Sequence, residues 1–202
     1  MSRFIKSLAL ASVLAVTASS AQAASTVFAD AASFNLQVAA GSYFNSLATV
    51  GNGGTSEIIL PINLSGNGFA YSISATGAGL YSDGVTTGNW NSGDPVTITF
   101  TGNPVRAIGF NVYLGNAAGT LQTDVPYSIT LSDGTNDSFT PLSTSNYRGY
   151  VTAGAPITSI TFNPVTRFYN FSNITVGDSI PEPTTLAVLA GAGALVLRRR
   201  RA

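Results

Sequence analysis

The chain has 202 residues and combines few charges with much glycine, since 9% of its residues are charged and 21 are glycine. It has neither cysteine nor histidine, which excludes disulfide scaffolds, Ser-His-Asp catalysis and zinc sites built from Cys or His. The formal net charge of zero is unevenly distributed, because six of the nine basic residues lie at the two ends. The chain between them carries three arginines against eight carboxylates, a formal charge of −5. This acidic balance argues against a nucleic-acid partner.

The N-terminus has the three parts of a secretory signal peptide. Arg3 and Lys6 form a positively charged start, residues 8–16 are apolar, and Ala21-Gln22-Ala23 is an A-x-A cleavage motif. We expect cleavage before Ala24, after delivery to the Sec machinery and to signal peptidase.

A short helix is predicted over residues 30–41. Asp30 is a suitable N-cap, Phe34 and Val38 lie one turn apart, and Gly41 is a candidate to end the helix. The apolar residues from Phe34 to Val38 also alternate, so a strand is the alternative.

From Glu57 onward the sequence predicts β-strands separated by turns. Strands are expected at 58–64, 69–75, 80–85, 96–100, 108–114, 125–131, 147–152, 157–162 and 168–176. Apolar and polar side chains alternate in most of them, which is typical of half-buried antiparallel strands. Pro61 is tolerated only at an edge or a bulge, and a change of alternation predicts a bulge near Ser172. Nine or ten strands with little helix predict an all-β fold, an antiparallel β-sandwich of jelly-roll type.

The last two dozen residues contain three parts in a fixed order. Pro181, Glu182 and Pro183 form a rigid motif that does not enter a helix. Residues 184–197 are uncharged and mostly apolar, and predict a hydrophobic helix. A stop-transfer block follows, made of Arg198, Arg199, Arg200 and Arg201. The chain thus divides into a signal peptide (1–23), a β-sandwich domain (24–178) and a C-terminal sorting and anchor segment (179–202).

This arrangement resembles the PEP-CTERM sorting signal of Gram-negative bacteria, in which the same three parts occur in the same order. The resemblance implies an exported protein, anchored transiently in the inner membrane and processed at Pro181-Glu182-Pro183 by an exosortase, a transpeptidase-like membrane enzyme. It further implies a final place at the cell surface or outside the cell. The alternative is an ordinary C-terminal membrane anchor with an incidental Pro-Glu-Pro. At about 14 residues the apolar helix rises roughly 21 Å, against about 30 Å of hydrocarbon, which suits a temporary anchor.

The strand segments resemble those of exported PEP-CTERM sandwich proteins, whose domains are similar in architecture to jelly-roll carbohydrate-binding modules. The segments that carry this resemblance are Val96–Phe100, Val105–Phe110, Leu131–Gly134, Ile157–Phe162 and Asn173–Gly177. Many members have Asp-Asn before the final strand. Here Ser172 replaces the Asp and Asn173 remains.

The single tryptophan, Trp90, is flanked by Asn89 and Asn91. An indole beside two amides suits the stacking of a sugar ring and hydrogen bonding to its hydroxyls, so these three residues are candidates for glycan binding. The more common role of such a tryptophan is to plug a core or a sheet edge.

Asp133, Asn136 and Asp137 form the densest cluster of oxygen ligands. They are the candidates for a metal, and structural calcium is the one cofactor considered. A plain hairpin turn at Asp133-Gly134 is the favoured interpretation. Arg106, the lone cation of its strand region, is expected to pair with a carboxylate across the sheet.

No catalytic residues are assigned. Glu57 with Asp83 or Asp94 would make the acid–base pair of a glycoside hydrolase, but the spacing does not bring them together, and turn capping is the expected role of most carboxylates here. We therefore expect a non-enzymatic exported protein with a structural or adhesive role in the cell envelope or in the extracellular polysaccharide matrix of a biofilm. The alternative is a carbohydrate-binding sandwich, with or without calcium. A carboxylate-based hydrolase is the third hypothesis.

Overall fold

The computed structural model describes residues 24–48, 50, 56–58, 61–77 and 79–180. These ranges contain fourteen strands and one helix, α1 (Ala31–Asn35). The strands are β1 (Thr26–Phe28), β2 (Tyr43–Asn45), β3 (Ser56–Ile58), β4 (Ile62–Gly66), β5 (Phe69–Ala75), β6 (Leu80–Ser82), β7 (Thr87–Asn89), β8 (Val96–Phe100), β9 (Ala107–Gly115), β10 (Tyr127–Leu131), β11 (Asn136–Phe139), β12 (Tyr147–Val151), β13 (Ser159–Phe162) and β14 (Phe168–Gly177).

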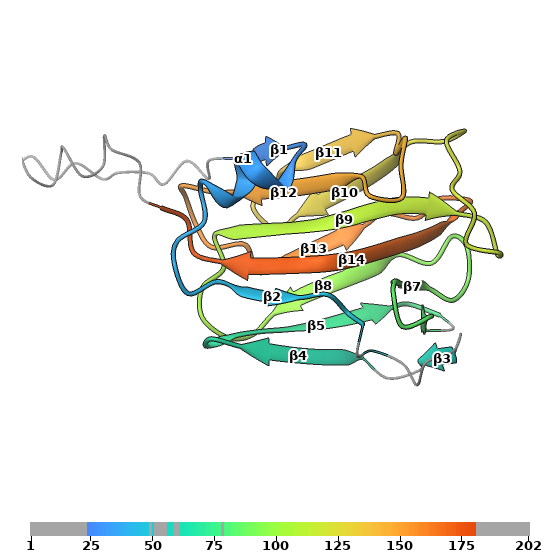
Figure 1. The fold of residues 1–202 in the computed structure, drawn as a ribbon, viewed down its shortest axis with the longest axis horizontal. Helices are drawn as coiled ribbons and strands as arrows, with labels where there is room; N and C mark the ends of the chain where they lie inside the picture. Colours follow the sequence, from blue (N-terminus) through green and yellow to red (C-terminus); the bar gives the residue numbers. More distant parts are fainter. Residues whose placement is uncertain (1–23, 49, 51–55, 59–60, 78, 181–202) are drawn as a thin grey trace, which may run out of the picture.

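The strands pair antiparallel in two sheets, which confirms the predicted all-β fold (Figure 1). Sheet I has eight strands in the order β1-β12-β9-β14-β7-β6-β3, and β2 also pairs with β14. Sheet II has six strands in the order β11-β10-β13-β8-β5-β4.

One hydrophobic core lies between the two sheets. In sheet II the alternate residues Phe69, Tyr71 and Ile73 of β5 are buried, because successive side chains of a strand point to opposite faces. The ring of Phe162 in β13 lies 5.2 Å from that of Phe110 in β9, centroid to centroid. The inward-facing residues of both sheets therefore pack against each other, as the alternation predicts.

The number of strands is higher than the nine or ten predicted. The predicted strand 58–64 is two strands, β3 and β4, with Pro61 between them, since proline cannot donate to a ladder. The predicted strand 80–85 ends at Ser82, where a turn leads into β7. Four strands were not predicted at all: β1, β2, β7 and β11. Each has only three or four residues, which is too short for alternation to be recognised.

Helix α1 confirms the predicted helix start but not its length. The side chain of Asp30 accepts a hydrogen bond from the backbone N–H of Ser33 at 2.8 Å, as an N-cap does. The helix ends at Asn35, and Gly41 lies in the turn before β2, with φ of 88°. Gly41 is therefore a turn residue, and its expected role as a helix cap is wrong.

The predicted bulge near Ser172 is confirmed. The register between β14 and β9 shifts between Ser172 and Thr175, and Asn173 has φ of 54°. Its side-chain nitrogen donates to Oδ1 of Asn111 at 3.0 Å. The bulge returns Ile174 to the core after Phe171.

Helix α1 covers one end of the outer face of sheet I. Phe34 is fully buried there, over Gly109 of β9 and Gly149 of β12. A Cβ atom at Gly149 would lie 2.5 Å from Cδ2 of Phe34. The ring of Tyr147 closes one side of Phe34, with 5.8 Å between the centroids. These contacts bury the outer face of β9 at Gly109.

The predicted signal peptide, the Pro181-Glu182-Pro183 motif, the apolar segment and the arginine block lie outside the described residues. Within the described ranges, no helix reaches the length and apolarity that a membrane crossing needs. The chain is held by the domain up to Ile180, whose backbone N–H donates to the carbonyl of Gln37 at 2.9 Å.

Candidate functional site

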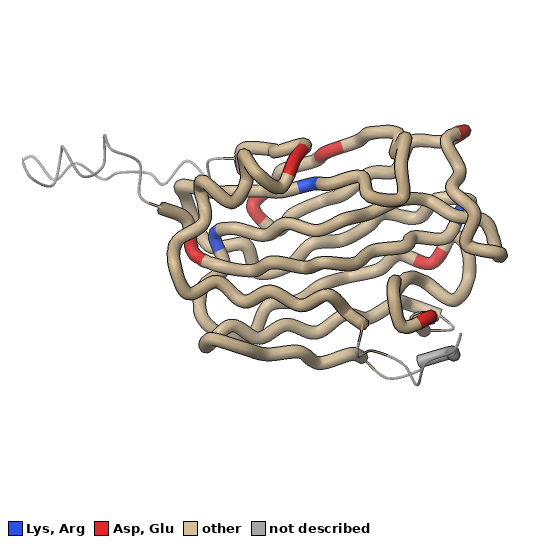
Figure 2. Tube along the Cα trace, in the orientation of Figure 1, with Lys and Arg blue, Asp and Glu red and all other residues tan. Residues whose placement is uncertain are grey.

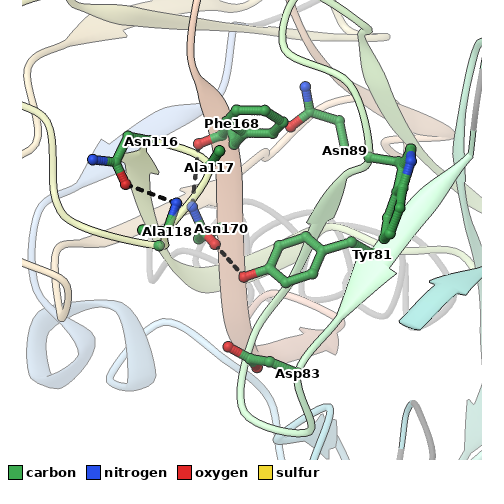
Figure 3. A pocket seen from close by; sticks show the side chains of 10 residues that line it. Tyr81, Asp83, Asn89, Asn116, Ala117, Ala118, Phe168 and Asn170 are labelled. Atoms are coloured by element: carbon green, nitrogen blue, oxygen red, sulfur yellow. Dashed lines mark hydrogen bonds between the residues drawn. The ribbon is translucent and has the colours of Figure 1, made fainter. Parts of the chain in front are cut away.

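A pocket of about 480 Å³ lies on the outer face of sheet I, at the end away from α1. It is lined by Tyr81, Asp83, Asn89, Trp90, Asn116, Ala117, Ala118, Gly119, Phe168 and Asn170. Figure 3 shows Asn116, Ala117 and Ala118 on one side and Tyr81 and Asn89 on the other, with Asp83 beyond the Tyr81 hydroxyl. The volume is within the range of roughly 300–1,000 Å³ typical of small-molecule sites.

The turn between β6 and β7 forms one wall. Asp83 shapes this turn, because its Oδ1 accepts the backbone N–H groups of Val85 at 2.8 Å and Thr86 at 2.6 Å. Burial alone would raise the pKa of Asp83, but the backbone N–H groups of Thr86 and Val85 outweigh it and lower that pKa below its ordinary value. Asp83 is therefore an ionised, oriented acceptor at neutral pH.

The loop between β9 and β10 forms the opposite wall. Oδ1 of Asn116 accepts the backbone N–H groups of Ala118 and Thr120, both at 3.0 Å. Gly119 has φ of 73°, a conformation that glycine adopts without strain. The loop is thus a closed turn that holds Ala117 and Ala118 against the pocket.

A hydrogen-bonded floor joins β6 to β14 beneath the pocket. The Tyr81 hydroxyl donates to Oδ1 of Asn170 at 2.7 Å, and Nδ2 of Asn170 donates to the carbonyl of Phe168 at 3.2 Å (Figure 3). Burial raises the pKa of Tyr81, and the nearby charge of Asp83 acts in the same direction. Tyr81 therefore remains a protonated donor, and this network fixes the side chains of the floor.

The three predicted glycan-binding residues have different places. Trp90 lines the pocket and is 37% exposed, so it lies at the rim and is not a core plug. Asn89 also lines the pocket but is buried, with its Oδ1 accepting Tyr169 N–H at 2.6 Å and its Nδ2 donating to the Asn91 carbonyl at 2.5 Å. Its amide therefore holds the backbone, and Asn91 is not among the lining residues.

Sequence reasoning missed Tyr81, Phe168, Asn170 and the 116–119 loop. Tyr81, Phe168 and Asn170 are outward-facing residues of strands whose inward neighbours are buried. Large aromatic or amide side chains on the polar face of a strand are a usable signal for a binding surface. Nothing local in the sequence, however, indicates that β6 and β14 come together.

Asp83 is the one charged residue among those that line the pocket. The three arginines in the described ranges each pair with a carboxylate elsewhere: Arg106 with Asp178 at 3.3 Å, Arg148 with Asp137 at 3.1 Å, and Arg167 with Asp124. The first pair confirms the predicted ion pair of Arg106. Figure 2 shows the charged residues sparse and spread over the described part of the chain.

The candidate calcium ligands lie in the hairpin between β10 and β11, as the favoured interpretation predicts. Oδ2 of Asp133 accepts the Ser25 hydroxyl at 2.5 Å, while Oδ2 of Asp137 accepts the Tyr150 hydroxyl at 2.9 Å and pairs with Arg148. Asn136 donates to the carbonyl of Gly134 at 3.1 Å. Over the described residues, no three acidic side chains are grouped so as to hold a metal ion.

The chain was compared with protein-family models, curated proteins and solved structures. None of them matches. The pocket is therefore interpreted from its own chemistry. Three aromatic side chains beside fixed amides and one carboxylate can stack an apolar ring face and bond several hydroxyls, which are the two demands of a sugar.

Proposed function

We propose that the chain is an exported, C-terminally sorted protein that binds carbohydrate of the cell envelope or the extracellular polysaccharide matrix. Its role is structural or adhesive, without catalytic turnover, and its domain is a β-sandwich of jelly-roll type. The observation that carries the binding role is the outer-face pocket, where Trp90, Phe168 and Tyr81 surround hydrogen-bonding groups.

Export and sorting rest on the sequence of the two ends. The Sec machinery, signal peptidase and an exosortase are the proposed partners, and the protein passes from the inner membrane to the cell surface or beyond. We expect Glu182→Ala to leave the protein unprocessed at the inner membrane, whereas Thr185→Ala, three residues further on, is processed normally. Cell fractionation and the intact mass of the product test this. A Glu182→Ala protein with the same mass and location as the processed parent protein would contradict it.

Carbohydrate binding is tested by applying the full-length chain to a glycan array, with and without a calcium chelator. We expect Trp90→Ala to weaken binding about tenfold, because the stacking surface at the rim is lost. Phe44→Ala is the matched control, since Phe44 is an exposed aromatic residue of β2 in the same sheet, outside the pocket lining. If glycan binding is lost when the chelator is present, calcium is required for binding. A folded chain that retains no glycan would refute the proposal.

A carboxylate-based hydrolase is the second candidate function. The ladder of β3 and β6 pairs Glu57 with Tyr81, so the backbone of Glu57 lies next to a pocket residue. A glycosidase requires two carboxyl groups about 5–10 Å apart, and Asp83 would be the other. Release of reducing sugar from a bound glycan, lost in Glu57→Gln and in Asp83→Asn, would establish this activity; we expect no release.

A further inference from the structure

We propose that the pocket selects neutral sugars, one or two hexose units at a time, with a pair of sugar hydroxyls on the Asp83 carboxylate. This inference rests on the proposed carbohydrate binding and names its ligand class. It is carried by the charge of the pocket, the orientation of Asp83 and the aromatic lining.

The charge of the lining disfavours anionic sugars. Asp83 is its one charged group, and the arginines of the described domain are paired with carboxylates outside the pocket lining. A uronate or sulfate group in the pocket would meet a like charge without a compensating cation, which is unfavourable in a partly desolvated site. A neutral polyol meets no such penalty.

The carboxylate of Asp83 is oriented before any ligand arrives. Three hydrogen bonds from its own turn involve Oδ1, namely the backbone N–H groups of Val85 and Thr86 and the Thr86 hydroxyl. The Thr86 hydroxyl also lies 3.2 Å from Oδ2. An ionised carboxylate accepts about four hydrogen bonds, so capacity remains on Oδ2. Two neighbouring hydroxyls of a pyranose are suitable donors, whereas the carboxylate group of a uronate offers no donor to this site.

The remaining lining suits the apolar face of a sugar ring. Trp90 is exposed at the rim, Phe168 and Tyr81 are partly buried, and Ala117 and Ala118 give the opposite wall an apolar surface. The C–H groups of a hexose can stack on such rings while its hydroxyls reach Asp83 and Asn116. About 480 Å³ admits one or two sugar units and not a longer stretch of a chain.

The test is calorimetric titration of the full-length chain, in a detergent without a sugar headgroup, with four disaccharides. Cellobiose, maltose and mannobiose are the neutral probes, and digalacturonic acid is the anionic probe. We expect at least one neutral disaccharide to bind about tenfold more tightly than digalacturonic acid. Asp83→Asn should reduce the difference in affinity between the neutral disaccharide and digalacturonic acid. The substitution removes the negative charge that repels the uronate while the side chain keeps its size. Ala118→Trp, a substitution on the exposed loop, should abolish binding by filling the pocket without disturbing the core.

The outcomes separate the two proposals. Equal or tighter binding of digalacturonic acid would overturn the selectivity and leave the carbohydrate-binding function intact. Neutral binding that Ala118→Trp and Trp90→Ala leave unchanged would overturn the assignment to this pocket. Failure of every disaccharide and every array glycan to bind the folded chain would refute the proposed function itself.

Discussion

The two ends of the outer face of sheet I are built from similar residues but are used differently. At one end Gly109 and Gly149 leave a hollow that the chain fills with its own side chain, Phe34. At the other end the space beside Gly115 holds the side chain of Asn170, where a Cβ would come within 2.7 Å of Nδ2, and Asn170 in turn lines the open pocket. Figure 1 shows α1 and β7 at these opposite ends.

Glycine residues on a sheet leave space above the backbone. The segment that lies over this space determines whether it is filled by a side chain or stays open. Phe34 fills the first hollow because Asp30 starts a helix just before it. The pocket has walls but no such plug, because Asp83 and Asn116 each bend their loop into a closed turn. One end therefore contributes to stability, and the other is free to bind a ligand.

The largest expected effect is that of Phe34→Ala at the covered end. Truncating a fully buried phenylalanine leaves a cavity and costs about 3–5 kcal/mol of the free energy of unfolding. Leu36→Ala is the control, because Leu36 is 74% exposed two residues further on, and it should change the free energy by less than about 0.5 kcal/mol. Urea unfolding measures both. Equal stability of the two variants would show that the covered end does not support the fold.

Gly149→Ala tests the same contact from the sheet side. Alanine for glycine in a compatible backbone normally stabilises a protein by about 0.4–1 kcal/mol. Here the new Cβ would press on the Phe34 ring, so we expect a loss of about 1–3 kcal/mol instead. In the double variant with Phe34→Ala this loss should be mostly relieved, because the ring is gone and only the Cβ of residue 34 remains, 3.1 Å from the new Cβ. Additive losses in urea unfolding would contradict the contact.

The sequence predicts the strands of this domain well where the alternation is long. The bounds of β5 and β8 agree with the prediction at every residue, because five to seven alternating residues define a face. Strands such as β7, with three residues, are recognisable only from their partners. Their existence depends on pairing with strands far along the chain, which no local pattern reveals.

The candidate site was predictable only in part for the same reason. Trp90 stands out by composition, and it lies at the pocket. The hydrogen bond between Tyr81 and Asn170 joins residues 89 positions apart, and it depends on β7 lying between β6 and β14. For Asn89 the prediction is misleading in the other direction. An amide beside a tryptophan suggests a ligand contact, but the side-chain oxygen of Asn89 accepts the backbone N–H of Tyr169.

Gly115→Ala tests the pocket floor at the open end. The new Cβ would displace the side chain of Asn170 from the pocket floor. We expect glycan binding to fall about fivefold and the free energy of unfolding to fall by about 1–3 kcal/mol, because Asn170 is 1% exposed and loses its hydrogen bonds to Tyr81 and Phe168. Calorimetric titration and urea unfolding of the same preparation check this. A variant that binds as the parent does would show that the Asn170 position is not part of the site.

The smallest effect concerns acid, and it distinguishes the two ends through Asp83 and Asp30. Hydrogen bonds from Ser33 to Asp30 lower the pKa of its carboxyl, and Thr86 and Val85 do the same for Asp83 against the raising effect of burial. Each carboxylate therefore stabilises the fold above the unfolded pKa of about 3.9, and this contribution is lost as the pH falls through the lower folded pKa.

Both Asp30→Asn and Asp83→Asn should thus reduce the acid dependence of stability below about pH 4. They should differ in binding. The affinity of the parent chain for a neutral disaccharide is expected to stay constant from neutral pH down to about pH 4 and then to fall as Asp83 is protonated. Tyr81 and Tyr113, which interact electrostatically with Asp83, have pKa values raised by burial and do not titrate there. In Asp30→Asn the affinity should still fall below about pH 4. In Asp83→Asn the affinity should no longer depend on pH in this range. The same profile in both variants would place the titrating group outside the pocket.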